Sequence, residues 1–338
     1  MWLAADDCGG SMNKQTGNMA IPSTADIPMT RRLRDPQRFM LPVFIVAMAV
    51  VVGAVEPRFV SKANLLNLIQ QLAPFLILTV GQAFAIIGGG LDLSVAAVLA
   101  GSGAVGVIAM QHLGIPLGVA AMILTGLCAG AFNGFIITRF RVSPFITTLG
   151  TMSVFRGLTL VITGGTPLYD IPSRFLDVFG DGTILTLPVS GVIAICCVLL
   201  GAFVLSRTVF GRYVYAVGAN TSAAYNSGVP IARTNLMIYS FSGLMAGIAA
   251  LVLTSWVSAA QPLAGQGLEL QSIAAVVIGG GTLTGGSGTM SGIFFGVVLL
   301  GMLSNALNML GVSSFFQTAT IGVIIIIAVV LDQLRSRA

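Results

Sequence analysis

Long apolar runs separated by short polar segments cover most of this 338-residue chain. Most runs are about 17 to 25 residues long, which is the length that an α-helix needs to cross a bilayer. The pattern therefore predicts an all-α integral membrane protein with about ten transmembrane helices. The expected spans are residues 39–55, 66–88, 94–110, 116–138, 144–163, 188–205, 235–257, 270–284, 290–310 and 316–332.

Two glycine-rich breaks interrupt the apolar pattern, at residues 86–95 (IIGGGLDLSV) and 277–292 (VIGGGTLTGGSGTMSG). Each glycine costs a helix about 1 kcal/mol relative to alanine. Irregular backbone at membrane depth is tolerated only where protein buries it or where it lines a water-filled cavity. We therefore expect the breaks to line a translocation path or to form a conformational lock. The candidate residues are Gly88, Gly89, Gly90, Asp92, Ser94, Gly279, Gly280 and Gly281. The shared IGGG is consistent with an internal repeat.

Two charged residues fall at membrane depth. Asp92 either caps the next span, with Ser94 as the alternative cap, or serves the path or lock. Arg156 follows Pro144 by twelve residues, which places it about 18 Å into the bilayer, where a charge needs a partner or water. A lock between Arg156 and Asp92 is one hypothesis.

The longest polar interruption in the second half of the chain is the basic loop 206–234. Its sequence predicts a helix of about two turns, because Asn220 is a good N-cap, Gly228 suits a left-handed C-terminal position and Pro230 prevents continuation. One interpretation is an ordinary cytoplasmic loop, and the other is an element that a partner protein binds. The residues of this candidate docking element are Arg212, Asn220, Ala223, Ala224 and Gly228.

The distribution of basic residues predicts the orientation of the chain. With the ten expected spans, twelve lysines and arginines fall on one side, three on the other and Arg156 within a span. Because cytoplasmic loops carry the excess of positive charge, both termini are expected in the cytoplasm. Residues 1–38 are polar and aperiodic and are expected to be a disordered cytoplasmic tail, and residues 39–335 a single transmembrane domain.

Composition excludes several classes of protein. Only 8% of the residues are charged, against about 25% in soluble domains, so the chain cannot cover a water-facing surface. Neither Lys14 nor Lys62 lies in a P-loop pattern, and a single histidine, His112, leaves no Cys/His metal set. We therefore expect no enzyme activity, no bound cofactor or metal and no nucleic-acid partner. One membrane acid gives little support for an ion-coupled carrier.

The longest outer loop, residues 164–187, contains Phe175 and Phe179 four residues apart, which is the spacing of one face of a short helix. The loop is expected to be either a solvated connection or a gate or docking surface for an extracytoplasmic partner.

Four segments in this order resemble the permease subunits of bacterial ABC importers for monosaccharides, the ribose-type or simple-sugar family. They are GGGLDLSV (88–95), SPFITTLGTMSVFRGLTLVITGGTP (143–167), FGRYVYAVGANTSAAYNSGV (210–229) and IAAVVIGGGTLTGGSGTMSG (273–292). The resemblance runs from about residue 40 to residue 335. It implies a multi-pass protein of the bacterial inner membrane that forms the path for a monosaccharide or a similar small polar solute.

The resemblance also implies the partners of the chain. These are a second permease copy or a sister permease, a periplasmic sugar-binding protein and a cytoplasmic ATPase subunit that holds ATP and Mg. It further implies that loop 206–234 contains the helix that couples the permease to the ATPase. The alternatives are the same architecture for a polyol, a furanose signal, a nucleoside or a branched-chain amino acid, or an ion-coupled secondary carrier.

Overall fold

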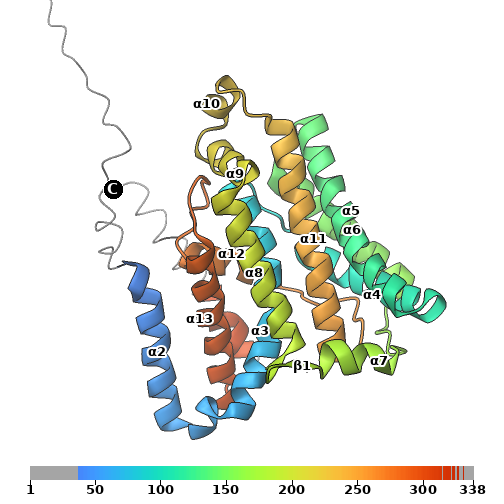
Figure 1. Ribbon diagram of the computed structural model, residues 1–338, viewed down its shortest axis with the longest axis vertical. Helices are drawn as coiled ribbons and strands as arrows, with labels where there is room; N and C mark the ends of the chain where they lie inside the picture. The colour runs from blue at the N-terminus through green and yellow to red at the C-terminus, as the bar shows by residue number, and fades with distance from the viewer. Residues whose placement is uncertain (1–36, 314, 321, 324–325, 327–329, 331–338) are drawn as a thin grey trace, which may run out of the picture. The chain divides into compact units, whose positions relative to one another are not determined.

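The computed structural model describes residues 37–313, 315–320, 322–323, 326 and 330. Its helices belong to one compact unit that begins at Arg38 (Figure 1). The elements are α2 (Gln37–Val55), η1 (Pro57–Val60), α3 (Lys62–Ile87), α4 (Val95–Leu113), α5 (Ile115–Phe140), α6 (Pro144–Thr163), α7 (Ser173–Phe175), η2 (Leu176–Gly180), β1 (Thr183–Ile184), β2 (Leu187–Pro188), α8 (Val189–Arg207), α9 (Val209–Ala219), α10 (Thr221–Asn226), α11 (Ile231–Val257), α12 (Leu268–Ile278) and α13 (Met290–Met309).

Seven described helices are long and apolar enough to cross a membrane, namely α3, α4, α5, α6, α8, α11 and α13. The helical membrane class is therefore confirmed, but the count of ten is not. The expected first span appears as the shorter apolar stretch Met40–Val55. The last expected span, 316–332, lies mostly outside the described residues.

The expected span 270–284 is wrong, because α12 contains only 11 residues and ends before the three glycines at 279–281. A helix of this length is about 16 Å long, roughly half of the 30 Å hydrocarbon layer. The chain also departs from an all-α fold at one two-stranded hairpin, in which β1 pairs antiparallel with β2.

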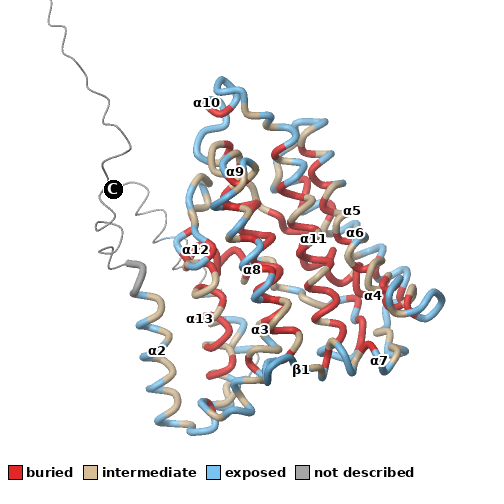
Figure 2. Tube along the Cα trace, viewed as in Figure 1, coloured by how far each residue is buried: buried red, intermediate tan, exposed pale blue. Residues whose placement is uncertain are grey.

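Helices α3 and α11 form the core of the bundle, and buried residues follow both along most of their length (Figure 2). Helix α11 packs backbone to backbone against α5. A Cβ on Gly126 of α5 would lie 2.8 Å from the Cα of Gly247, and a Cβ on Gly130 would lie 2.9 Å from the Cα of Gly243. Glycine at these positions lets the two helices approach closely, which is how membrane helices pack where hydrophobic burial gives no driving force.

The two ends of the bundle carry different structures. Helix α10 lies at the end where α5 finishes and α11 begins, whereas α7, η2 and the hairpin lie at the opposite end (Figure 1). The short helix expected around Phe175 and Phe179 is present as α7 and η2. The two rings lie 5.2 Å apart, and Phe175 is fully buried. This segment is therefore packed onto the bundle and is not merely a solvated loop.

Candidate functional site

The two glycine breaks adopt the same backbone geometry. Helix α3 ends at Ile87 and α12 at Ile278, and in each case the second following glycine has a positive φ, 82° at Gly89 and 85° at Gly280. The next amides then fold back onto the last helical turn in a Schellman motif. The matching hydrogen bonds, each 2.9 Å long, run from Gly89 N to Ile86 O, from Gly90 N to Ala85 O, from Gly280 N to Val277 O and from Gly281 N to Val276 O.

The two breaks also contact each other and the end of α9. The amide of Gly286 donates a hydrogen bond of 2.8 Å to the carbonyl of Ile87, so the second break binds the end of α3 directly. Gly218 of α9 closes the contact. A Cβ on Gly218 would collide with the carbonyl of Ile87 and would lie 2.6 Å from the amide of Gly286. We call these residues, 87–89, 218 and 285–286, the glycine junction.

Tyr215 adds a side-chain contact to the same region, because its hydroxyl donates a 2.8 Å hydrogen bond to the carbonyl of Gly288. Tyr215 lies one turn before Gly218 on α9. The second break is therefore bound to α9 both by backbone packing and by this hydrogen bond. No signal in the sequence beyond the presence of glycine pointed to Gly218 as a contact.

Helix α10 follows Gly218 of the glycine junction almost immediately. It has the N-cap and the C-terminal glycine that the sequence predicted. The Asn220 side chain accepts from the amide of Ala223 at 2.9 Å, and Gly228 has a φ of 79°. The amide of Gly228 donates to the carbonyl of Tyr225, and that of Val229 donates to the carbonyl of Ala224. The capped helix is therefore confirmed as a structure.

One residue of the expected docking face points the wrong way. Ala224 is only 5% exposed, because its side chain faces the bundle, whereas Ala223 is exposed and Tyr225 is 71% exposed. Arg212, one of the other candidates, lies on the exposed surface of α9. A docking surface on α10 would therefore be formed by Ala223 and Tyr225 and not by Ala224.

Asp92 ties the first break to two neighbouring helices. One carboxylate oxygen accepts from the amide and the hydroxyl of Ser94, at 3.0 and 2.6 Å, and the other accepts from the hydroxyl of Ser242 on α11 at 2.8 Å. Asn133 of α5 donates to the Ser94 hydroxyl at 2.7 Å. Asp92 is 1% exposed. Ser94 is the N-cap of α4, but its side chain makes no capping hydrogen bond. Ser242 and Asn133 were not anticipated from the sequence.

Arg156 of α6 supports a different irregular segment. Its guanidinium donates to the carbonyls of Pro262 and Ala264, at 2.9 and 3.4 Å, in the connection between α11 and α12. Glu269, at the start of α12, is close enough to interact with it electrostatically. Asp92 and Arg156 thus bind separate partners, and the hypothesis of a lock between them is wrong for this conformation.

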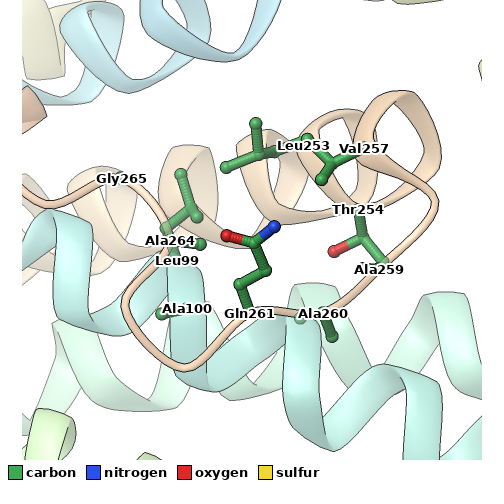
Figure 3. A pocket seen from close by; sticks show the side chains of 11 residues that line it. Leu99, Ala100, Leu253, Thr254, Val257, Ala259, Ala260, Gln261, Ala264 and Gly265 are labelled. Atoms are coloured by element: carbon green, nitrogen blue, oxygen red, sulfur yellow. The ribbon is translucent and has the colours of Figure 1, made fainter. Parts of the chain in front are cut away.

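The segment held by Arg156 also borders a cavity of about 120 Å³ (Figure 3). Residues 259–261, Ala264 and Gly265 form one wall of this cavity, and α4 and α11 form the others. Figure 3 shows the amide of Gln261 pointing into the space between Leu99 and Leu253. The carbonyl acceptors that this irregular segment exposes explain why a positively charged residue is retained in α6.

Seven long apolar helices, with glycine breaks after α3 and α12, are typical of a multi-pass membrane protein. The comparisons agree. The family described as "branched-chain amino acid transport system / permease component" matches residues 64–329. The chain therefore belongs to this family of transport-system permeases. It is a multi-pass protein of the bacterial inner membrane.

Several relatives carry more specific names. The chain is 42% identical to the ribose import permease protein of Bacillus subtilis, over 86% of this chain and 90% of the relative. It is 36% identical to the D-allose transport system permease of Escherichia coli, over 87% and 91%, and 36% identical to the L-arabinose ABC transporter permease of Azospirillum brasilense, over 87% and 86%. No solved structure matches the chain.

Proposed function

We propose that this chain is the membrane-spanning subunit of an ATP-driven importer and that it forms the path for a monosaccharide. The similar relatives are named for ribose, D-allose and L-arabinose, which are all neutral monosaccharides. The family description names branched-chain amino acids instead. We favour a sugar because the relatives at 36–42% identity are individual proteins similar to this chain. The family description, in contrast, covers a broader set of proteins. A polyol, a furanose signal or a nucleoside is chemically close enough to share such a path.

The observation that carries the coupling mechanism is the glycine junction. Gly218 lies two residues before the N-cap of α10 and touches the backbone of both breaks. A partner that moves α10 would also move α9. Because Gly218 has no side chain and contacts backbone atoms directly, the displacement would pass to those backbone atoms. The movement would then reach the end of α3 and the segment between α12 and α13 together.

In this mechanism α10 faces the cytoplasm and binds an ATPase subunit, which holds ATP and Mg and supplies the energy. The chain itself acts as a permease and not as an enzyme. A periplasmic binding protein delivers the sugar at the opposite end, where α7, η2 and the hairpin lie. A second copy of the chain, or a sister permease, completes the path.

Reconstitution tests this function directly. The chain is placed in proteoliposomes with its ATPase subunit and binding protein, and uptake of labelled D-ribose, D-allose and L-arabinose is measured. Uptake of at least one sugar should require ATP, stop with vanadate and survive a proton uncoupler. Uptake that ignores vanadate and stops with the uncoupler would instead establish an ion-coupled carrier. ATP-dependent uptake of leucine but of no sugar would show that the substrate is a branched-chain amino acid instead.

A further inference from the structure

A polar cavity lies beside the first glycine break, at the end of the bundle that carries α10. Its volume is about 280 Å³, more than twice that of the cavity near Gln261. Gly88–Gly90, the end of α5, the start of α11 and Thr221 of α10 form its walls. It therefore adjoins both the break and the proposed coupling helix.

Three polar side chains line this cavity without a hydrogen-bonding partner among the described residues. They are Arg141, at the end of α5, and Asn235 and Tyr239, one turn apart on α11. Tyr239 is the most informative of them because the residue is only 3% exposed, yet its hydroxyl is not among the fully buried polar atoms, so it is reached from the cavity that it lines. Its hydroxyl lies over Gly90, where an added Cβ would collide with it.

The backbone beside the cavity has two notable features. Arg141 has a φ of 55°, a left-handed conformation that is uncommon outside glycine and is often found at functional sites. Ser242, one turn after Tyr239 on α11, binds the carboxylate of Asp92 at 2.8 Å and so fixes this part of α11 against the first break. The contact of Ser242 with Asp92 therefore fixes the part of α11 that carries Tyr239 next to the first break.

We propose that this cavity binds the ring of a neutral sugar as the sugar leaves the path on the coupling side. A guanidinium, a carboxamide and a phenol match the alternating donors and acceptors of neighbouring sugar hydroxyls, and Arg141 presents its donors in a planar fork. The volume accommodates one small ligand and no more. Because Thr221 forms part of the wall, movement of α10 changes the cavity. The proposal rests on the function proposed above and adds the residues that contact the substrate.

Thiol labelling tests the proposal on the reconstituted transporter. Val142, which also lines the cavity, is replaced by cysteine in a chain whose four native cysteines are changed to alanine. A membrane-impermeant maleimide is then added from the α10 side with and without D-ribose. We expect D-ribose to slow the labelling of Val142→Cys. Adding Tyr239→Phe or Asn235→Ala should weaken this protection about tenfold, which is the effect of losing one good hydrogen bond.

The matched control is Ser240→Ala, because Ser240 neighbours Tyr239 but its hydroxyl donates to the carbonyl of Leu236 on its own helix. It should leave the protection unchanged. Equal protection in Tyr239→Phe, Asn235→Ala and the unsubstituted cavity would overturn the proposal. Protection by D-ribose 5-phosphate and not by D-ribose would also overturn it, because the cavity would then bind an anionic metabolite. If ATP-dependent sugar uptake persists while protection is absent, the cavity assignment fails and the proposed function stands.

Discussion

Arg156 and Asp92 are both charged residues among apolar helices, but their surroundings impose different requirements. Arg156 satisfies two backbone carbonyls of an irregular connection, whereas Asp92 accepts three hydrogen bonds from two serines. A buried polar group that loses its partner costs about 1–3 kcal/mol. The effect of each substitution should therefore depend on which partners it leaves without a hydrogen bond.

Arg156→Ala should destabilise the connection between α11 and α12 and lower uptake, because the carbonyls of Pro262 and Ala264 lose their donor. We expect a loss of about 2 kcal/mol or more, measured as a lower midpoint of thermal aggregation in detergent. Arg156→Lys is the control, since an ammonium can still donate to one of these carbonyls. Normal stability and uptake in Arg156→Ala would show that the carbonyls find water instead.

Asp92→Ala should be more damaging than Asp92→Asn. The asparagine keeps one oxygen that can accept from the Ser94 amide, while the Ser242 hydroxyl can rotate to accept from the new amide group. Alanine removes all three acceptor contacts, and we expect it to cost about 3 kcal/mol. The measurement is thermal stability together with sugar uptake. Equal damage in both variants would mean that the negative charge, and not its hydrogen bonding, is required.

At the scale of elements, α10 is a short helix whose stability depends on its caps and whose exposed face is small. Ala223→Arg should leave membrane insertion intact and abolish co-purification with the ATPase subunit, because the new side chain projects from the exposed face. Pull-down from detergent extracts measures this loss. Retained ATPase binding and full transport would mean that the ATPase subunit binds elsewhere, at residues 139–143 or 282–290.

Ala224→Arg tests a different property of the same helix. Because the Ala224 side chain is buried, an arginine there should disrupt the packing of α10 as well as any contact with a partner. We expect α10 of Ala224→Arg to be cleaved by protease much faster than α10 of Ala223→Arg. Equal resistance of the two variants would show that α10 tolerates rotation about its axis.

Gly218→Ala tests the glycine junction. The methyl group collides with both the carbonyl of Ile87 and the amide of Gly286, so the variant should retain ATPase binding but lose most of its transport. Uptake and ATP hydrolysis are measured together, and hydrolysis without transport is the expected signature. Gly150→Ala on α6 is the control, because nothing lies within 4 Å of its added Cβ. Full transport in Gly218→Ala would exclude the junction from coupling.

At the scale of the whole molecule, eight of the ten described basic residues lie toward one end of the bundle or the other; Arg38 is at the start of α2 and Arg156 lies within α6. Five lie toward the end with α10, namely Arg139, Arg141, Arg207, Arg212 and Arg233. Arg58, Lys62 and Arg174 lie toward the opposite end with α7. By the positive-inside rule, this separation predicts that the α10 end faces the cytoplasm.

A periplasm-specific reporter fused after Arg337 should be inactive, and the same reporter inserted after Leu185, at the exposed tip of the hairpin, should be active. The physical reason is that the α10 end carries the excess of basic residues and should stay in the cytoplasm. Enzyme activity of the reporter in intact cells is the measurement. Activity after Arg337 would mean that the chain crosses the membrane an odd number of times.

The sequence by itself determined the properties that depend on local chemistry. Apolar run length specified the membrane class, and Asn220 and Gly228 specified the ends of α10, because a cap requires only residues within one or two turns of each other. The same is true of the glycines after Ile87 and Ile278. The expected 270–284 span was wrong because apolar content over a window does not reveal that these glycines end α12 after 11 residues.

Tertiary structure alone decided which of these local features meet. The partners of Arg156 are backbone carbonyls more than a hundred residues away, and any residue type can supply a carbonyl. Gly218 touches both breaks through backbone atoms, which leave no pattern of side chains in the sequence. Ala224 faces inward because of how α10 packs on α9 and α11. Such contacts depend on how helices far apart in the sequence pack against each other. No local pattern of residue types predicts that packing.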